Sequence, residues 1–229
     1  MKKFAAIGLG NFGLNLSRAL IENGCEVLGI DSSREAVNTA KDFISHAVIG
    51  DASNREVLES LSLRDFDGAI VSIGQEMAIS ILISLYLKEI GVKRIVVRAI
   101  SEDHGKVLKM IGVSDIIMPE RDMAERLANM LSLKNVVDYL PIGEDYGIIE
   151  VPSPKSFIGK TLRDLQIPNR FNCQVIGLKI FEEPGSGFHF TDKDSTIKIP
   201  PSADDIMTPG MIMIIIGKQQ DIEKIQAIK

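Results

Sequence analysis

Residues 7–13 read Ile7-Gly8-Leu9-Gly10-Asn11-Phe12-Gly13, with three glycines in the spacing G-x-G-x-x-G. The apolar run Phe4–Leu9 leads into them, and a helical pattern begins at Asn11. In that setting the first glycine permits a tight turn, and the second lets a pyrophosphate approach the backbone. The third lets the helix pack close to the strand. The stretch therefore predicts the first crossover of a dinucleotide-binding parallel sheet.

Short apolar runs alternate with helical segments through the first half of the chain. The predicted strands are Phe4–Leu9, Cys25–Ile30, Ala47–Ile49, Ala69–Ser72, Arg94–Arg98 and Asp115–Met118. The predicted helices are Asn11–Asn23, Arg34–Asp42, Asn54–Ser60, Glu76–Ile90 and Glu102–Ile111. Ser53 and Glu56 predict a capping box at the start of the third helix. Six such alternations predict an α/β fold, a Rossmann-like parallel six-stranded sheet covered on both faces.

The pattern changes after Pro119. Arg121–Leu133 predicts an amphipathic helix. The following segment is poorer in helix, with predicted strands at Gly147–Val151, Gln174–Phe181 and Met211–Ile216, and helices at Ser156–Leu165 and Asp221–Ile228. Residues 182–187 suggest a hairpin turn. We place the boundary near Asn135–Gly143, giving a nucleotide-binding domain over 1–134 and a small α+β domain over 135–229. A domain of about 90 residues is small, so we expect it to bury a face against a second copy.

Composition excludes several classes of protein. The chain has 229 residues, a net charge of −5, 45% hydrophobic and 25% charged residues, the balance of an ordinary globular protein. The acidic balance disfavours a general nucleic-acid binder. The longest apolar run, Met211–Ile216, falls far short of the roughly 20 residues of a membrane-spanning helix. The start of the chain shows no signal-peptide pattern. We therefore expect a cytosolic protein, or one on the cytosolic side of something else.

Cysteines and histidines give no sign of a metal site. Cys25 and Cys173 lie far apart in apolar runs, so neither a disulfide framework nor a zinc cluster is indicated, and we expect both to be buried. His46, His104 and His189 are not spaced as metal ligands. His104 lies at a charged helix start, where we expect a solvated side chain.

The carboxyl ends of parallel strands should rim one crevice. Asp31 ends the second strand 18 residues after Gly13, placed to accept hydrogen bonds from ribose hydroxyls and to repel a 2′-phosphate. Arg98 could meet phosphate charge, and Glu120 could hold a divalent ion that bridges to phosphates. For both, the alternative is a surface salt bridge. The predicted cofactor-binding residues are Gly8, Gly10, Asn11, Phe12, Gly13, Asp31, Ser32, Asp51, Ala52, Ser72, Ile73, Gly74 and Arg98, and the predicted metal ligand is Glu120.

No catalytic apparatus accompanies this pocket in the sequence. None of Tyr86, Tyr139 and Tyr146 has a lysine four residues later, so no Tyr-x-x-x-Lys pair exists. Gly159-Lys160-Thr161 is not the end of a P-loop, because Pro154 stands where that loop needs glycine. We therefore expect a ligand-binding protein that is not an enzyme. An NAD-dependent oxidoreductase with a small substrate domain is the alternative, since the glycine motif supports both.

Four stretches together resemble the RCK (also called KTN) proteins of the Ktr/Trk potassium-uptake systems, of the KtrA/TrkA type. They are Ile7–Gly13, Asp31, Gly50-Asp51-Ala52-Ser53 and Pro119-Glu120-Arg121-Asp122-Met123-Ala124. Gly159-Lys160-Thr161-Leu162 and the late run Met211–Gly217 resemble the small C-terminal domain of that family. The resemblance covers essentially the whole chain.

The resemblance implies a cytosolic gating subunit, peripheral on the cytosolic face of the cell membrane. Such proteins form dimers that assemble into an octameric ring under a membrane-embedded, potassium-translocating subunit (KtrB/TrkH-like). ATP/ADP or NAD(H) bind the N-domain and change the shape of the ring, with ATP favouring transport in the Ktr branch. By similarity, Glu120 would coordinate Mg²⁺ or another divalent cation near the γ-phosphate.

In several members of this family the cleft of the C-domain dimer binds cyclic di-AMP, which inhibits. In this chain Arg170 and Asn172 would lie near that cleft, and whether it binds cyclic di-AMP stays open. One position departs from the family. Many ATP-responsive relatives carry arginine where this chain has Asn11, and asparagine brings no charge to a phosphate. The choice between ATP/ADP and NAD(H) therefore stays open.

Overall fold

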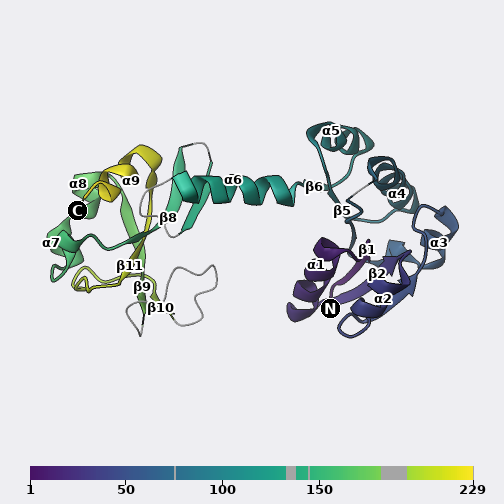
Figure 1. Cartoon of the computed structure of the whole chain (residues 1–229), viewed down its shortest axis with the longest axis horizontal. Coiled ribbons are helices and arrows are strands. Elements are labelled where there is room, and N and C mark those ends of the chain that lie inside the picture. The colour runs from purple at the N-terminus through teal and green to yellow at the C-terminus, as the bar shows by residue number, and fades with distance from the viewer. Residues whose placement is uncertain (75, 133–137, 144, 182–194, 229) are drawn as a thin grey trace. The chain divides into compact units, whose positions relative to one another are not determined.

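The computed structural model describes residues 1–74, 76–132, 138–143, 145–181 and 195–228 (Figure 1). The chain divides into two compact units, Met1–Glu120 and Arg121–Lys229. The predicted hairpin turn at 182–187, His189 and the first residues of the predicted boundary at Asn135–Gly143 lie outside the described residues. A functional division after residue 134 stays a prediction.

The first unit is built on a parallel sheet with the strand order β3-β2-β1-β4-β5-β6. The strands are β1 (Lys3–Ile7), β2 (Glu26–Asp31), β3 (His46–Ile49), β4 (Gly68–Val71), β5 (Ile95–Arg98) and β6 (Asp115–Ile117). Every neighbouring pair is parallel, which confirms the predicted six-stranded Rossmann-like sheet. The strand order reverses between β1 and β4, and ligands of such sheets bind outside the carboxyl ends of the strands at that point.

Helices cover both faces of this sheet (Figure 1). They are α1 (Asn11–Glu22), α2 (Arg34–Ala40), α3 (Arg55–Ser60), the short 3₁₀ helix η1 (Leu63–Asp65), α4 (Met77–Ile90) and α5 (Glu102–Ile111). Alternate strand residues divide the apolar core: Ala6 packs with Val37 of α2, whereas Ala5 packs with Leu58 and Leu87 on the other face. The strands thus read as continuous apolar runs because both of their faces are buried.

The cap of α3 differs from the prediction by one residue. Asn54, not Ser53, is the N-cap, and its side chain accepts a hydrogen bond of 3.0 Å from the backbone N–H of Glu56. The hydroxyl of Ser53 donates instead to Asp51 at 2.7 Å. Serine and asparagine are comparable N-caps, so the sequence did not decide between two neighbouring candidates.

The second unit has an antiparallel sheet of order β10-β9-β11-β8-β7. Its strands are β7 (Asp138–Ile142), β8 (Tyr146–Pro152), β9 (Gln174–Phe181), β10 (Ser195–Lys198) and β11 (Ile212–Lys218). Its helices are α6 (Pro119–Ser132, whose first two residues count with the first unit), η2 (Lys155–Phe157), α7 (Leu162–Leu165), α8 (Ile167–Phe171) and α9 (Gln219–Gln226). Phe157, Ile149 and Ile215 lie at the centre of its core. The small α+β domain is confirmed, although β7, α8 and β10 were not predicted.

Helix α6 buries none of its residues. Its apolar side chains stay exposed, at 54% for Met123, 41% for Leu127 and 78% for Leu131. The side chain of Arg126 forms an ion pair with Asp138 and so connects the helix to β7. The predicted amphipathic helix is therefore present, but within the described chain no core covers its apolar stripe.

His104 does not lie where the sequence suggested. The prediction of a solvated side chain is wrong, because His104 is fully buried in the first turn of α5. Its Nδ1 accepts a hydrogen bond of 3.3 Å from the backbone N–H of Ile100. Burial lowers its pKa, which favours the neutral imidazole. Of the cysteines, Cys173 is buried as expected and Cys25 is only half-buried.

Replacing Phe157 by alanine should destabilise the protein by about 3–5 kcal/mol, because a fully buried phenylalanine leaves a cavity in the core of the second unit. Urea unfolding followed by circular dichroism measures this loss. The matched control is Met110→Ala, since Met110 is 79% exposed on α5, and we expect a change within about 0.5 kcal/mol. A loss for Phe157→Ala no larger than that of the control would contradict the assigned core.

Candidate functional site

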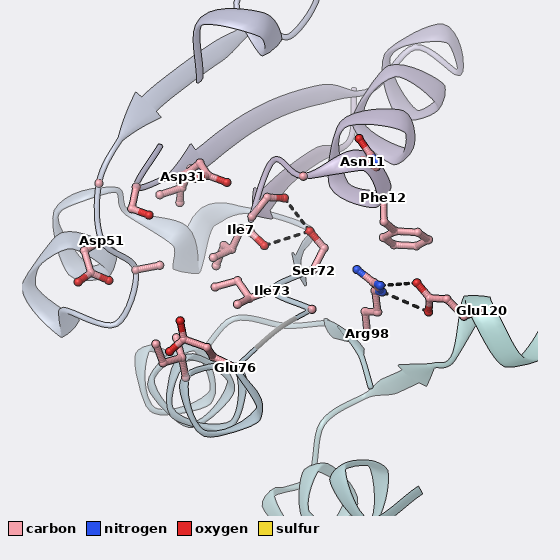
Figure 2. A pocket seen from close by; sticks show the side chains of 18 residues that line it. Ile7, Asn11, Phe12, Asp31, Asp51, Ser72, Ile73, Glu76, Arg98 and Glu120 are labelled. Carbon is pink, nitrogen blue, oxygen red and sulfur yellow. Dashed lines mark hydrogen bonds and ion pairs between the residues drawn. The ribbon is translucent and has the colours of Figure 1, made fainter. Parts of the chain in front are cut away.

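A cavity of about 590 Å³ lies at the carboxyl ends of the strands in the first unit (Figure 2). It is formed by the loops that follow β1, β2, β3 and β4, by the end of β5, and by the start of α6. The lining residues are Ile7, Gly8, Gly10, Asn11, Phe12, Ile30, Asp31, Ser32, Gly50, Asp51, Ala52, Ser72, Ile73, Gly74, Glu76, Ile79, Arg98 and Glu120.

The three glycines of the loop are required for three different reasons. Gly8 has φ +91°, a conformation that favours glycine. A Cβ on Gly13 would lie 2.0 Å from the carbonyl oxygen of Gly8, so helix α1 can approach β1 only without that atom. A Cβ on Gly10 would meet no protein atom within 4 Å, and Gly10 lines the cavity. Packing among the described residues therefore does not require glycine at position 10, whereas the close approach of a ligand phosphate to the backbone would require it.

Helix α1 begins at this loop with its first-turn amides available. Its N-cap is Gly10, which makes no side-chain capping bond, and no acidic residue lies in its first turn. The N–H groups and the positive end of the helix dipole attract anions. Ser72 at the end of β4 holds the loop in place, because its hydroxyl donates a hydrogen bond of 2.6 Å to the carbonyl oxygen of Gly8.

Asp31 is held rigidly at the end of β2. One carboxylate oxygen accepts a hydrogen bond of 2.6 Å from the backbone N–H of Leu9, and the other accepts one of 2.7 Å from Ser33. A carboxylate has about four lone-pair positions, so each oxygen keeps a free position for a ribose hydroxyl. The same bonds join the glycine loop to β2, which gives Asp31 a structural role as well.

Asp51 follows β3 on the other side of the cavity. The hydrogen bonds donated by the side chain and the backbone of Ser53 lower its pKa below the ordinary value. Asp51 is therefore an ionised acceptor at neutral pH. Together with Ala52 it lines this side of the cavity.

Arg98 and Glu120 form an ion pair at the opposite end of the cavity (Figure 2). Two nitrogens of the guanidinium donate to the two oxygens of the carboxylate. The guanidinium also lies over the ring of Phe12, 5.8 Å from its centre. Partial burial raises the pKa of Glu120, but the hydrogen bond from Arg98, a backbone hydrogen bond and the charge of the guanidinium together outweigh this effect, and the pKa lies below its ordinary value. Glu120 is therefore ionised at neutral pH.

The charge of the cavity is negative. Four carboxylates line it, those of Asp31, Asp51, Glu76 and Glu120, whereas Arg98 is the only lysine or arginine among the lining residues that the structure describes. Four negative charges and one positive charge leave a formal excess of three negative charges. A ligand with several phosphates would meet this field with little cationic compensation from the chain.

The cavity brings the predicted site residues together, apart from Gly13, which shapes the loop from behind. Whether they bind a nucleotide stays a prediction. Sequence reasoning did not assign five lining residues to the site, Ile7, Ile30, Gly50, Glu76 and Ile79. The two strand-end isoleucines looked like core residues. Glu76 carried a signal, because it directly precedes the helix that follows β4, at the same edge of the sheet as Asp31.

Among the described residues, no cluster of three or more histidine, cysteine, aspartate or glutamate side chains could hold a metal ion. A divalent cation at Glu120 would therefore take most of its ligands from phosphate oxygens and water, which is the usual arrangement for Mg²⁺. The described helices likewise include none with the length and apolarity that a bilayer crossing demands.

A smaller cavity of about 260 Å³ lies in the second unit. Its lining residues are Leu162, Arg163, Ile167, Pro168, Gln174, Val175, Pro201 and Ala203. Arg170 and Asn172, which were expected near a cleft of this domain, are not among them. The Arg170 guanidinium lies over the ring of Phe171, and the Asn172 side chain donates to Asp221.

Sequence comparison assigns both halves of the chain. Residues 4–119 match the TrkA-N domain and residues 147–229 match the TrkA-C domain. Over 225 residues the chain is 38% identical to the Ktr system potassium uptake protein C of Bacillus subtilis, covering 98% of this chain and 96% of that protein. It is 34% identical to the Ktr system potassium uptake protein A of Vibrio alginolyticus, covering 96% and 94% of the two chains.

Solved structures share the fold. The RCK domain of GsuK superposes with a TM-score of 0.66 at 14% identity, over 99% of this chain and 47% of that one. The GsuK channel bound to NAD gives a TM-score of 0.63 at 15% identity, over 96% and 38%. The chain thus spans less than half the length of either GsuK chain, and the likeness at this identity concerns the fold alone. From its two matched domains and its full-length identity to the Ktr proteins, the chain belongs to the family of Ktr/Trk potassium uptake proteins with a TrkA-N and a TrkA-C domain.

Proposed function

We propose that the chain is the regulatory subunit of a potassium transporter, which binds an adenine nucleotide or NAD(H) in its first unit and converts ligand state into a change of assembly shape. The observation that carries the proposal is the cavity itself. It combines a glycine loop, the open space beside Gly10 and the fixed carboxylate of Asp31, in a chain that is 38% identical to a Ktr potassium uptake protein.

The chemistry of the cavity suits an adenosine-containing ligand. Asp31 would accept the ribose hydroxyls, the wall at Asp51 and Ala52 would face adenine, and the start of α1 would hold the phosphates. The excess of negative charge favours either NAD(H), which carries few charges, or ATP accompanied by Mg²⁺ or another divalent cation at Glu120. A further phosphoryl group shifts a conformational equilibrium only if one shape binds it more tightly than the other.

The assembly belongs to the same proposal. The exposed apolar stripe of α6 supports a homodimer, because a single chain leaves Met123, Leu127 and Leu131 uncovered. We propose that such dimers build an octameric ring on the cytosolic face of the membrane, bound to a KtrB/TrkH-like potassium-translocating subunit. The net charge of −5 suits the positively charged cytoplasmic loops of such a partner.

The second unit is the proposed site of cyclic di-AMP. The cavity between Leu162 and Ala203 supplies apolar side chains for bases. The guanidinium of Arg163 is paired with Asp204, and a phosphate would take the place of that carboxylate. Thermal-shift measurement with cyclic di-AMP tests this assignment, since a ligand of the folded state raises the melting temperature.

An NAD-dependent oxidoreductase is the competing function, because the glycine motif also suits a redox cofactor. Incubation with NAD and a panel of alcohols and hydroxy acids distinguishes the two. Formation of NADH at enzymatic rates would overturn the regulatory proposal, whereas binding without turnover would support it.

Replacing Asp31 by alanine should weaken the binding of ADP and of NAD at least about tenfold, because two hydrogen bonds to a charged acceptor are lost. Isothermal titration calorimetry measures the affinity. Because Asp31 also holds the N–H of Leu9, the melting temperature of the ligand-free variant must be compared with that of the wild type. Asp42→Ala, an exposed aspartate outside the cavity, is the control. Wild-type affinity in a folded Asp31→Ala variant would refute the ribose role.

Magnesium should raise the affinity for ATP in the wild type and leave it unchanged in Glu120→Gln, because an amide is a poor ligand for this ion. Titration of ATP with and without MgCl₂ gives the ratio of affinities. Asp122→Asn, which removes a carboxylate two residues further along α6 and outside the cavity, should keep the ratio. An equal ratio in wild type and Glu120→Gln would exclude Glu120 as a metal ligand.

A further inference from the structure

We propose that Glu120 is an internal competitor for the ligand: in the free protein its carboxylate occupies the guanidinium of Arg98, and a nucleoside polyphosphate binds by displacing it. This inference rests on the proposed nucleotide-binding function and adds a specificity-determining residue to it. Only a ligand whose phosphate reaches Arg98 separates the pair.

The geometry of the pair matches that of an arginine–phosphate contact. Two guanidinium nitrogens of Arg98 face the two oxygens of Glu120, and the planar fork of arginine binds carboxylate and phosphate in the same bidentate manner. Figure 2 shows this fork at the end of the cavity next to Phe12, with Glu120 on its outer side. The carboxylate thus takes the donors that a phosphate would use.

Of the two partners, Arg98 is the fixed one. Its side chain is 21% exposed, against 63% for that of Glu120. The guanidinium is held over the Phe12 ring and passes across Gly74, where a Cβ would lie 2.5 Å from Nη1. Glu120 shows no comparable packing and lies in the first turn of α6. Displacement therefore moves Glu120 and leaves Arg98 in place.

The energetic balance favours exchange. An ion pair with one mostly exposed partner contributes little, because solvent screens it. A phosphate attached to a ligand that is already held by Asp31 and by the start of α1 arrives at high effective concentration. Arg98 is the only cation among the described lining residues, so it is the one cationic side chain of the cavity with which a phosphate can pair.

The position of Glu120 gives the exchange a consequence. Glu120 is the last residue of the first unit, and the next residues of α6 belong to the second unit. The ion pair ties the start of α6 to β5, so its separation releases the first turn of that helix. Adenosine alone, which has no phosphate, would leave the pair closed.

The test compares binding without divalent cations, in EDTA, so that the proposed metal role of Glu120 does not contribute. We expect Glu120→Gln to bind ADP about two- to fivefold more tightly than the wild type, the range that an exposed ion pair spans. Glu76→Gln removes a carboxylate from the same cavity without breaking this pair, and so measures the effect of charge alone. The increase in ADP affinity in Glu120→Gln should exceed the increase in Glu76→Gln. Neither variant should bind adenosine more tightly than the wild type does.

A double-mutant cycle isolates the competition. In an Arg98→Gln background, Glu120→Gln should increase the affinity for ADP no more than Glu76→Gln does. No guanidinium then remains for which the carboxylate and the phosphate could compete. Melting temperatures of the ligand-free variants confirm that each is folded. A gain in Glu120→Gln that equals that of Glu76→Gln, or that persists without Arg98, overturns the inference. Failure of the wild-type chain to bind any adenine nucleotide or NAD(H) would instead refute the proposed function, and the inference with it.

The release of α6 has its own readout. The chain contains no tryptophan, so Glu125→Trp places a single fluorophore on α6, five residues beyond Glu120 and away from the apolar stripe of Met123, Leu127 and Leu131, at a side chain that is 68% exposed. Addition of ADP should lower its fluorescence anisotropy when Glu120 is present. In the Glu120→Gln background the anisotropy should be low at the start and unaffected by ADP. The same decrease in both backgrounds would exclude a link between the ion pair and the helix.

Discussion

The close approach of α1 to β1 is the constraint on which the rest of the molecule depends. It is possible only because Gly13 lacks a side chain and presents its Cα to the carbonyl oxygen of Gly8. Ser72 fixes that carbonyl from β4, and Asp31 fixes the loop from β2. Three strands thereby meet at one point, and the cavity opens where their order reverses. The same contacts that stabilise the crossover also hold Asp31 and the start of α1 at the cavity, where the proposed ribose and phosphate contacts would be made.

In the proposed nucleotide complex, the electrostatics of the cavity would separate recognition of the nucleoside from recognition of its phosphates. Asp31 and Asp51 are hydrogen-bonded to backbone N–H groups, so both carboxylates are held in place, where they would serve as acceptors for a polar, neutral part of the proposed ligand. At the other end a single guanidinium already has a partner in Glu120. Under the proposed function, the number and charge of phosphates would decide how a ligand interacts with that end, whereas the sugar and base would decide whether it binds at all.

The sequence predicted the first unit well because its elements obey local rules. The glycine spacing, the apolar runs and the glycines that end α4 and α5 each specify one element without reference to the rest of the chain. The second unit was predicted less completely. Strands β7 and β10 are edge strands with exposed residues such as Leu140 and Ile197, so they show no apolar run. The burial of His104 and the pairing of Arg98 with Glu120 depend on residues that are distant in sequence, and no local pattern reports them.

The absence of buried residues along α6 has a consequence for how order arises in this protein. An isolated helix of 14 residues is marginal in water, because nucleation is costly and only packing of an apolar face offsets it. If a second chain supplies that packing, helical order in α6 becomes linked to chain concentration by mass action. The segment that joins the two units would then stiffen as copies associate, and dilution alone would soften it. Assembly and the rigidity needed to transmit a signal would be one and the same equilibrium.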